Sequence, residues 1–277
     1  MSFPPEQINC VQCGSGPPVV LVHGNPGTHS VWRPVAERLS AERMLFTPDL
    51  PGFGGTPAPA DAADYGVDRL ATAILGMAAN LGLERFDLVG HSFGGAIAIT
   101  MASIAPERVR TLTAITPMSS NIPSRARLAR MPLVVPIISG LWHIAPGWVR
   151  RRVVRSWTHV TYDKGYIASR SEEVARESDR AGLIRSVAGL VASTDYSLYD
   201  RRIDALQELA VPPVLLIGSG RDRVIPHSDF VSLVHRLARA RVHTFPEGGH
   251  VPIWQYPDEL CALLRGFWDE DLHGADA

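Results

Sequence analysis

Ser92 lies at the centre of residues 90–94, GHSFG, which match the pattern G-x-S-x-G. A glycine two positions away on either side leaves room for a sharp turn that exposes the serine hydroxyl. The apolar run Phe86–Val89 precedes the motif and a helical pattern, Gly94–Ile104, follows it, so the serine would stand between a strand and a helix N-terminus. This setting predicts a nucleophilic serine. The alternative is a glycine-rich helix start in which Ser92 is only an N-cap.

A serine hydroxyl is a weak nucleophile at neutral pH and needs a base, and that base needs a third group to hold its tautomer. His250 follows the run Arg241–Phe245 on a glycine-rich loop, and Asp222 follows the run Val214–Ile217. The chain order Ser92, Asp222, His250 is one in which such triads occur. We therefore predict that His250 is the base and that Asp222 orients it. Taken alone, Asp222 would more often be a turn residue or a helix cap.

A second loop could complete the site with backbone donors. Residues 23–27, HGNPG, follow the apolar run Val19–Val22 and form a tight loop that could reach the serine. We predict that the backbone N–H groups of Asn25 and Phe93 form an oxyanion hole, because such donors stabilise the negative charge that develops when serine attacks a carbonyl. An ordinary β-turn is the alternative for residues 23–27.

The elements that must position these loops are strands and helices in alternation. Six short runs closed by turn residues predict strands: the apolar run Val19–Val22, the weaker Met44–Thr47, and then Phe86–Val89, Leu112–Ile115, Val214–Ile217 and Arg241–Phe245. Helical patterns between or after them are Val31–Leu39, Val67–Leu81, Gly94–Ile104, Ser228–Leu237 and Asp258–Trp268. This alternation predicts an α/β fold with a mostly parallel central sheet flanked by helices. Ligands of such sheets lie beyond the carboxyl ends of the strands, where the three candidate residues fall.

The alternation stops at residues 118–206, which are mainly helical in pattern. We predict that this segment is an inserted helical cap and that residues 1–117 and 207–277 form the core. The segment carries 14 basic and 8 acidic residues, a net charge of +6, whereas the rest carries 13 basic and 20 acidic residues, a net charge of −7. Its uncharged stretch Met131–Val149 is interrupted by prolines and glycines, which argues against a membrane span. We expect this stretch to face inwards over the site.

Composition excludes several other classes of protein. The 277 residues are 45% hydrophobic and 20% charged, which is too apolar for a disordered chain. A net charge of −1 provides no basic field, so no nucleic-acid partner is expected. Three cysteines, an odd number, and an N-terminus without a secretion signal predict a cytoplasmic protein.

No metal and no cofactor are expected. Cys10 and Cys13 fall in a predicted strand, where residues three apart face opposite sides. The glycine-rich residues 52–55 are not followed by the Gly-Lys-Ser/Thr of a phosphate loop.

With these motifs the chain resembles the α/β-hydrolase superfamily, in its cap-bearing branch, along almost its whole length. The shared features are residues 23–27, residues 49–54 (DLPGFG), the turn at Ser92 and the loops of Asp222 and His250. The resemblance implies an eight-stranded sheet whose second strand is antiparallel, with residues 7–13 in the first strand and residues 19–22 in the third.

The expected function is that of a serine hydrolase which cleaves a carboxylic ester or related acyl compound through an acyl-enzyme. The apolar stretch Met131–Val149 predicts a small-molecule substrate that is fairly hydrophobic. The HGNP tetrapeptide also resembles haloalkane dehalogenases and epoxide hydrolases, but those families use an aspartate where this chain has Ser92. A carbon–carbon bond hydrolase, a lactonase or a perhydrolase with the same triad stays open, as does a receptor that turns its ligand over slowly.

Overall fold

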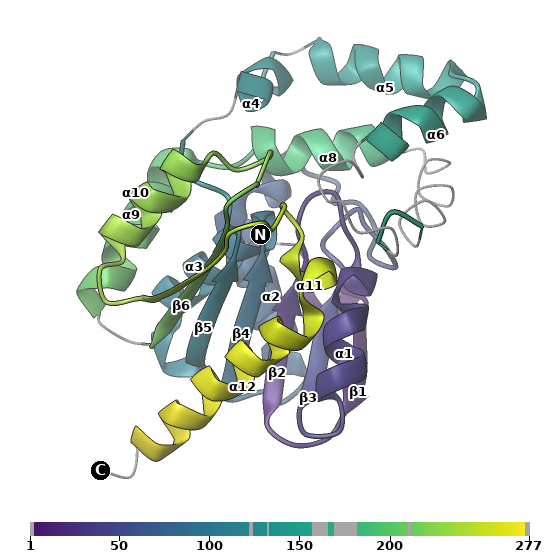
Figure 1. The fold of residues 1–277 in the computed structure, drawn as a ribbon. Helices are drawn as coiled ribbons and strands as arrows, with labels where there is room; N and C mark the ends of the chain where they lie inside the picture. Colours follow the sequence, from purple (N-terminus) through teal and green to yellow (C-terminus); the bar gives the residue numbers. More distant parts are fainter. Residues whose placement is uncertain are drawn as a thin grey trace.

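The computed structural model describes residues 3–121, 124–131, 133–156, 166–168, 182–209 and 212–274. Within these residues, seven strands form one sheet in the spatial order β1-β3-β2-β4-β5-β6-β7 (Figure 1). The strands are β1 (Cys10–Gly14), β2 (Pro18–Val22), β3 (Met44–Pro48), β4 (Phe86–His91), β5 (Val109–Ile115), β6 (Val214–Ser219) and β7 (Arg241–Phe245). Only β1 runs antiparallel to its neighbour, so the predicted α/β fold with a mostly parallel sheet is confirmed.

The strand count differs from the one that the resemblance implied. In the described part of the chain the sheet has seven strands, and β1 is itself the antiparallel strand, at the edge of the sheet beside β3. The run Val19–Val22 therefore lies in the second strand rather than the third. A motif in one loop carries no information about how many strands are added at a sheet edge, which explains the error.

Helices cover both faces of the sheet. One face is covered by α2 (Val67–Asn80), α3 (Phe93–Ile104), α9 (Tyr196–Leu209) and α10 (His227–Arg236), and the other by α1 (Arg33–Leu39), α11 (Pro252–Gln255) and α12 (Pro257–Gly274). Short 3-10 turns lie at Pro5–Gln7, His29–Trp32, Ala62–Tyr65 and Pro106–Arg108.

The two cores follow from the period of a strand, whose successive side chains point to opposite faces. In β2, Val20 and Val22 pack in the core beneath α2 and α3, while Val19 and Leu21 pack in the core beneath α1 and α12. Both faces of β2 are buried, which is why its sequence is continuously apolar instead of alternating.

In the described part of the predicted insertion, the helices α4 (Ser124–Ala129), α5 (Val134–Ile144), α6 (Gly147–Ser156) and α8 (Leu183–Ala192) lie beyond the carboxyl ends of the strands. Figure 1 shows α8 next to the sheet, with α5 above it at the outside of the molecule. The predicted end of the insertion at residue 206 falls within α9, which packs along α3. The domain boundaries stay a prediction.

The expectation that Met131–Val149 faces inwards is wrong for most of its large side chains. Among the described residues of this stretch, Trp142 is the one large side chain that is buried, while Leu133, Leu141 and Ile144 are exposed. The reason is that α5 lies in an outer layer of the molecule, where in the described part of the chain it packs on α8 and α4 (Figure 1). No helix in the described ranges combines the length and the apolar character that crossing a bilayer requires.

Candidate active site

Ser92 occupies the sharp turn between β4 and α3, with φ of 54° and ψ of −117°. This left-handed conformation is rare for residues with a side chain, and it places the hydroxyl at the N-terminus of α3. The two glycines of the motif make the turn possible. A Cβ on Gly90 would lie 2.2 Å from the carbonyl oxygen of Gly94, and one on Gly94 would lie 2.3 Å from that of Val22. The predicted strand–turn–helix is therefore present.

The structure brings His250 and Asp222 to this turn from the loops after β7 and β6. The His250 Nε2 atom lies 2.9 Å from Ser92 Oγ, and its Nδ1 atom lies 2.8 Å from Asp222 Oδ2. All three side chains are buried or nearly so. Because a carboxylate accepts hydrogen bonds, the Nδ1 proton of His250 faces Asp222, which leaves the Nε2 lone pair to accept the hydroxyl proton of Ser92.

Asp222 is itself fixed by its own loop. Its Oδ1 accepts backbone hydrogen bonds from Val224 and Ile225, at 2.7 and 3.0 Å. Burial by itself raises the pKa of Asp222, but the hydrogen bond and charge of His250 and these two N–H groups outweigh burial and hold the pKa below its usual value. The carboxylate is therefore ionised at neutral pH and can stabilise an imidazolium.

The backbone of His250 is held by two residues that the sequence did not single out. Its carbonyl oxygen lies 2.8 Å from His91 Nε2 and accepts a hydrogen bond of 3.0 Å from Thr116 Oγ1. Burial, with the proximity of the His250 imidazole, lowers the pKa of His91 to about 3, so His91 is neutral and donates from Nε2. His91 occupies a variable position of the G-x-S-x-G pattern, and no sequence signal marks either residue.

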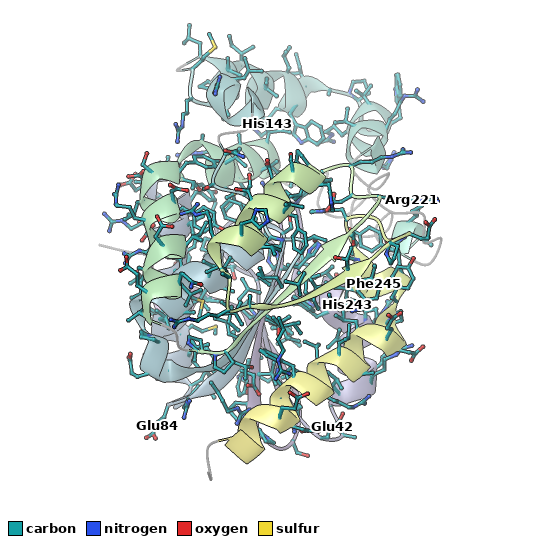
Figure 2. The ribbon with its side chains drawn as sticks, turned by 60° about the vertical axis from the view of Figure 1, so that its left-hand side comes forward. Glu42, Glu84, His143, Arg221, His243 and Phe245 are labelled. Atoms are coloured by element: carbon teal, nitrogen blue, oxygen red, sulfur yellow. The ribbon has the colours of Figure 1, made fainter. Side chains whose placement is uncertain are left out.

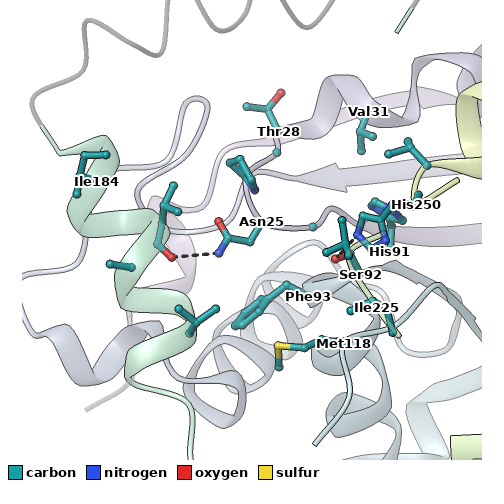
Figure 3. A pocket seen from close by; sticks show the side chains of 18 of the residues that line it. Asn25, Thr28, Val31, His91, Ser92, Phe93, Met118, Ile184, Ile225 and His250 are labelled. Carbon is teal, nitrogen blue, oxygen red and sulfur yellow. Dashed lines mark hydrogen bonds between the residues drawn. The ribbon is translucent and has the colours of Figure 1, made fainter. Parts of the chain in front are cut away.

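The predicted oxyanion donors line the same cavity as Ser92. Within the described part of the chain, the backbone N–H groups of Asn25 and Phe93 donate to no other atom. The Asn25 side chain donates from Nδ2 to the carbonyl oxygen of Val187 in α8, 3.1 Å away (Figure 3), and its buried Oδ1 has no hydrogen-bond partner among the described residues. Asn25 thus joins the loop after β2 to the helix that covers the site.

Asp49, at the end of β3, ties the neighbouring loops together. It accepts hydrogen bonds from the backbone N–H of His29 at 2.7 Å, from Asn9 Nδ2 at 2.8 Å and from the N–H of Gly55 at 2.8 Å, and His29 Nδ1 lies 3.0 Å away. Burial opposes ionisation, but these donors outweigh it and hold the pKa of Asp49 well below its usual range. In the sequence, Asp49 is the first residue of the DLPGFG segment, and no signal there marks it as a support of the site.

His23, the first residue of the HGNPG loop, fixes that loop from inside. Its Nε2 accepts a hydrogen bond of 2.9 Å from the backbone N–H of Leu50, so its Nδ1 carries the proton and donates to the carbonyl oxygen of Gly24, 2.8 Å away. The side chain is fully buried. The loop that carries Asn25 is therefore anchored directly to the segment after β3.

A cavity of about 490 Å³ opens over Ser92 and His250, beneath the inserted helices (Figure 3). Its apolar lining is Pro26, Val31, Phe93, Met118, Leu128, Ala129, Val134, Val135, Ile138, Ile184, Val187, Ala188, Val191, Val224, Ile225, Val251 and Trp254. The polar side chains in the lining are Asn25, Thr28, Ser30, His91, Ser92, Tyr166 and His250. In the described part of the chain, no Lys, Arg, Asp or Glu lines it.

Comparison with known proteins agrees with this fold. The family model described as alpha/beta hydrolase fold matches residues 17–257. The chain belongs to the alpha/beta hydrolase family. Both the fold and the serine at the turn, which is typical of this hydrolase family, are as the sequence predicted.

Relatives of this hydrolase are enzymes. It is 30% identical over 265 residues to a 2-hydroxy-6-oxo-2,4-heptadienoate hydrolase of Pseudomonas putida, covering 94% of this chain and 90% of that one. It is 28% identical over 270 residues to a 2-hydroxymuconate semialdehyde hydrolase of a Pseudomonas species, covering 95% and 91%. A solved structure of a thermophilic esterase from Thermogutta terrifontis superposes with a TM-score of 0.75 at 20% identity, covering 95% and 93%, which shows a shared fold.

Proposed function

We propose that this hydrolase cleaves a carboxylic ester of an uncharged, largely apolar compound, with Ser92 as nucleophile, His250 as base and Asp222 as the residue that orients the base. The observation that carries this proposal is the unbroken path of hydrogen bonds from Asp222 through His250 to Ser92, at 2.8 and 2.9 Å, which ends in an apolar cavity.

The reaction begins when His250 Nε2 accepts the proton of the Ser92 hydroxyl as Oγ attacks the ester carbonyl. Negative charge then develops on the carbonyl oxygen, and the backbone N–H groups of Asn25 and Phe93 stabilise it. Each donor of this kind typically contributes about 10²–10³ in rate. The protonated His250, stabilised by Asp222, gives its proton to the departing alcohol, and an acyl group remains on Ser92.

The second half of the reaction uses the same groups. Water enters in place of the alcohol, His250 removes its proton, and the resulting hydroxide attacks the acyl carbon. The second tetrahedral intermediate collapses to release the acid and to return the proton to Ser92. The chain needs no further reactant than water for this cycle.

The lining of the cavity favours an ester over the carbon–carbon bond cleavage that the names of the two Pseudomonas relatives suggest. Dienoates and muconates carry a carboxylate, and burying an anion needs a charged or strongly hydrogen-bonding partner. No arginine or lysine of the described chain lines this cavity. Carbon–carbon bond cleavage is nevertheless the second candidate, because the same triad can serve it and both relatives cover nearly the whole chain.

A panel of nitrophenyl esters of increasing acyl length tests the proposal. We expect kcat/KM to rise from acetate to acyl chains of medium length, as the apolar lining is filled, and we expect Ser92→Ala to abolish turnover. Faster cleavage of a 2-hydroxy-6-oxo-dienoate than of every ester would favour the second candidate. Ester turnover that survives Ser92→Ala would remove Ser92 from the mechanism.

We place the reaction in the cytoplasm, in keeping with three cysteines that are all free, and we expect a hydrophobic small molecule and no nucleic acid as partner. We also propose that residues 118–206 act as a cap over the core formed by residues 1–117 and 207–277, since α5 and α8 both contribute side chains to the roof of the cavity.

A further inference from the structure

The outward face of α5 is apolar. Leu133, which precedes the helix, and Ile137, Leu141 and Ile144 within it follow one another at intervals of four, four and three residues, which places them on one side. Their exposed fractions are 70%, 56%, 58% and 79%, far above those of core side chains. We call these four residues the outer stripe. A cap helix that met only water would carry polar residues on this side.

The next helix, α6, carries exposed aromatic and positively charged side chains. Trp148 of α6 is 67% exposed, and Arg151 and Arg152 follow it at three and four residues, on the same side of the helix. Between residues 124 and 156 the sequence holds seven arginines and no aspartate or glutamate. In Figure 2, His143 of α5 lies at this end of the molecule, while Glu42 and Glu84 lie at the opposite end.

We propose that the outer stripe and the arginines of α6 bind the surface of an anionic lipid bilayer. An apolar helix face flanked by Trp and Arg is the pattern of interfacial helices, which insert their apolar side between lipid head groups while cations meet lipid phosphates. The 11 residues of α5 are too few to span a bilayer, so the helix lies in the plane of the interface.

A second copy of the chain fits this surface less well. An isologous dimer through the outer stripe would bring the arginine-rich segment of one protomer against the same segment of the other, with no carboxylate in residues 124–156 to compensate. An anionic membrane offers the complementary charge instead.

The cavity over Ser92 lies on the other side of α5 from the outer stripe. Val134, Val135 and Ile138 of the same helix line the cavity over Ser92, so α5 separates the outer stripe from the site. Docking would place an apolar cavity beside the acyl region of the membrane. The binding proposal does not depend on the reaction and can be tested on a protein without activity.

Vesicle co-sedimentation of the full chain tests the proposal, with two kinds of vesicle: phosphatidylcholine alone, and an equal mixture of phosphatidylcholine and phosphatidylglycerol. We expect binding to the mixed vesicles, weak binding to the neutral ones, and release by salt. The variant Arg151→Gln/Arg152→Gln should lower the partition coefficient by about five-fold for each arginine, or about 25-fold. The variant Ile137→Ser/Leu141→Ser/Ile144→Ser should lower it at least about ten-fold.

Matched controls remove the same kinds of side chain elsewhere. Leu81→Ser/Leu209→Ser removes two exposed leucines outside the surface, and Arg69→Gln/Arg239→Gln removes two exposed arginines from α2 and the segment after α10. Both controls should bind as the natural chain does. Circular dichroism, and hydrolysis of a soluble nitrophenyl ester, verify that every variant is folded.

Three outcomes overturn the proposal. The first is no sedimentation with either vesicle. The second is equal loss of binding in the control variants. The third is a chain that is dimeric in analytical ultracentrifugation without lipid and becomes monomeric in the stripe variant, which would make a second copy the occupant of the surface.

Discussion

Replacing Asp222 by Asn tests how the base is oriented while changing the loop very little. The amide oxygen of Asn can still accept the backbone hydrogen bonds of Val224 and Ile225, which now end on Oδ1 of Asp222. The amide NH₂, however, replaces the oxygen that faces His250 Nδ1 and cannot accept its proton. The imidazole then carries its proton on Nε2, toward Ser92, and can no longer act as the base.

The size of the effect follows from the geometry. In the transition state His250 becomes an imidazolium whose Nδ1 lies 2.8 Å from a buried carboxylate oxygen. At an effective dielectric constant of about 20, opposite charges at this separation attract by about 6 kcal/mol. Since about 1.4 kcal/mol corresponds to a factor of ten, loss of this attraction predicts a fall in kcat of roughly 10⁴.

The assay is steady-state hydrolysis of a nitrophenyl ester by the natural chain, Asp222→Asn and a control, Asp229→Asn. Asp229 is a carboxylate at the start of α10 that accepts hydrogen bonds from Ser119 and Asn121 and does not line the cavity. The control should keep kcat within a few-fold of the natural value. A folded Asp222→Asn variant that retained more than about a tenth of kcat would refute the reasoning about the tautomer.

Three further predictions concern the supports of the site. Thr116→Val removes one of the two hydrogen bonds that the His250 carbonyl oxygen accepts, and such a bond contributes about 1 kcal/mol. We therefore expect kcat to fall roughly five-fold at unchanged KM, and we expect Thr116→Ser to restore it. An unchanged kcat in Thr116→Val would show that Thr116 does not position His250. Asp49→Asn should lower the free energy of unfolding by about 3 kcal/mol at pH 7 in urea titrations. Because the folded-state pKa of Asp49 is lowered, the ionised carboxylate stabilises the fold fully above the ordinary carboxyl pKa of about 4. The difference in the free energy of unfolding between the natural chain and Asp49→Asn should therefore shrink as pH falls below that value. A difference that stays constant with pH would contradict an ionised Asp49. Gly94→Ala should not fold stably, because the new Cβ would lie 2.3 Å from a carbonyl oxygen of β2, whereas Gly140→Ala, with open space around it, should raise the melting temperature slightly.

The loops that carry Ser92, Asp222 and His250 could be predicted from the sequence for a simple reason. Each follows a short run that forms a strand, and the carboxyl ends of parallel strands meet at one edge of the sheet. Identifying the strands was therefore enough to bring together three residues that are far apart in the chain.

The supports of the triad were beyond sequence reasoning, because they depend on which backbone groups the folded loops leave within reach. His91 and Thr116 bind the carbonyl oxygen of residue 250, a group that every residue type possesses. Asp49 could be noted in a motif, but its hydrogen bonds to Asn9 and His29 follow from the loops around β3.

The outer stripe illustrates a different limit. The periodicity of residues 131–149 shows that the segment is apolar, but it does not show which side another element covers. In the structure α8 covers one side of α5, and the opposite side, with Leu133 and Ile144, faces outwards.

The central claim is that Ser92 becomes acylated during turnover. Acid quenching in the first turnovers of a nitrophenyl ester, followed by peptide mass spectrometry, measures this directly. We predict an acyl adduct on the peptide that contains Ser92, and its disappearance when His250 is replaced by Ala. Steady ester hydrolysis with no adduct at Ser92, or with an adduct on another residue that turns over at the catalytic rate, would contradict the account.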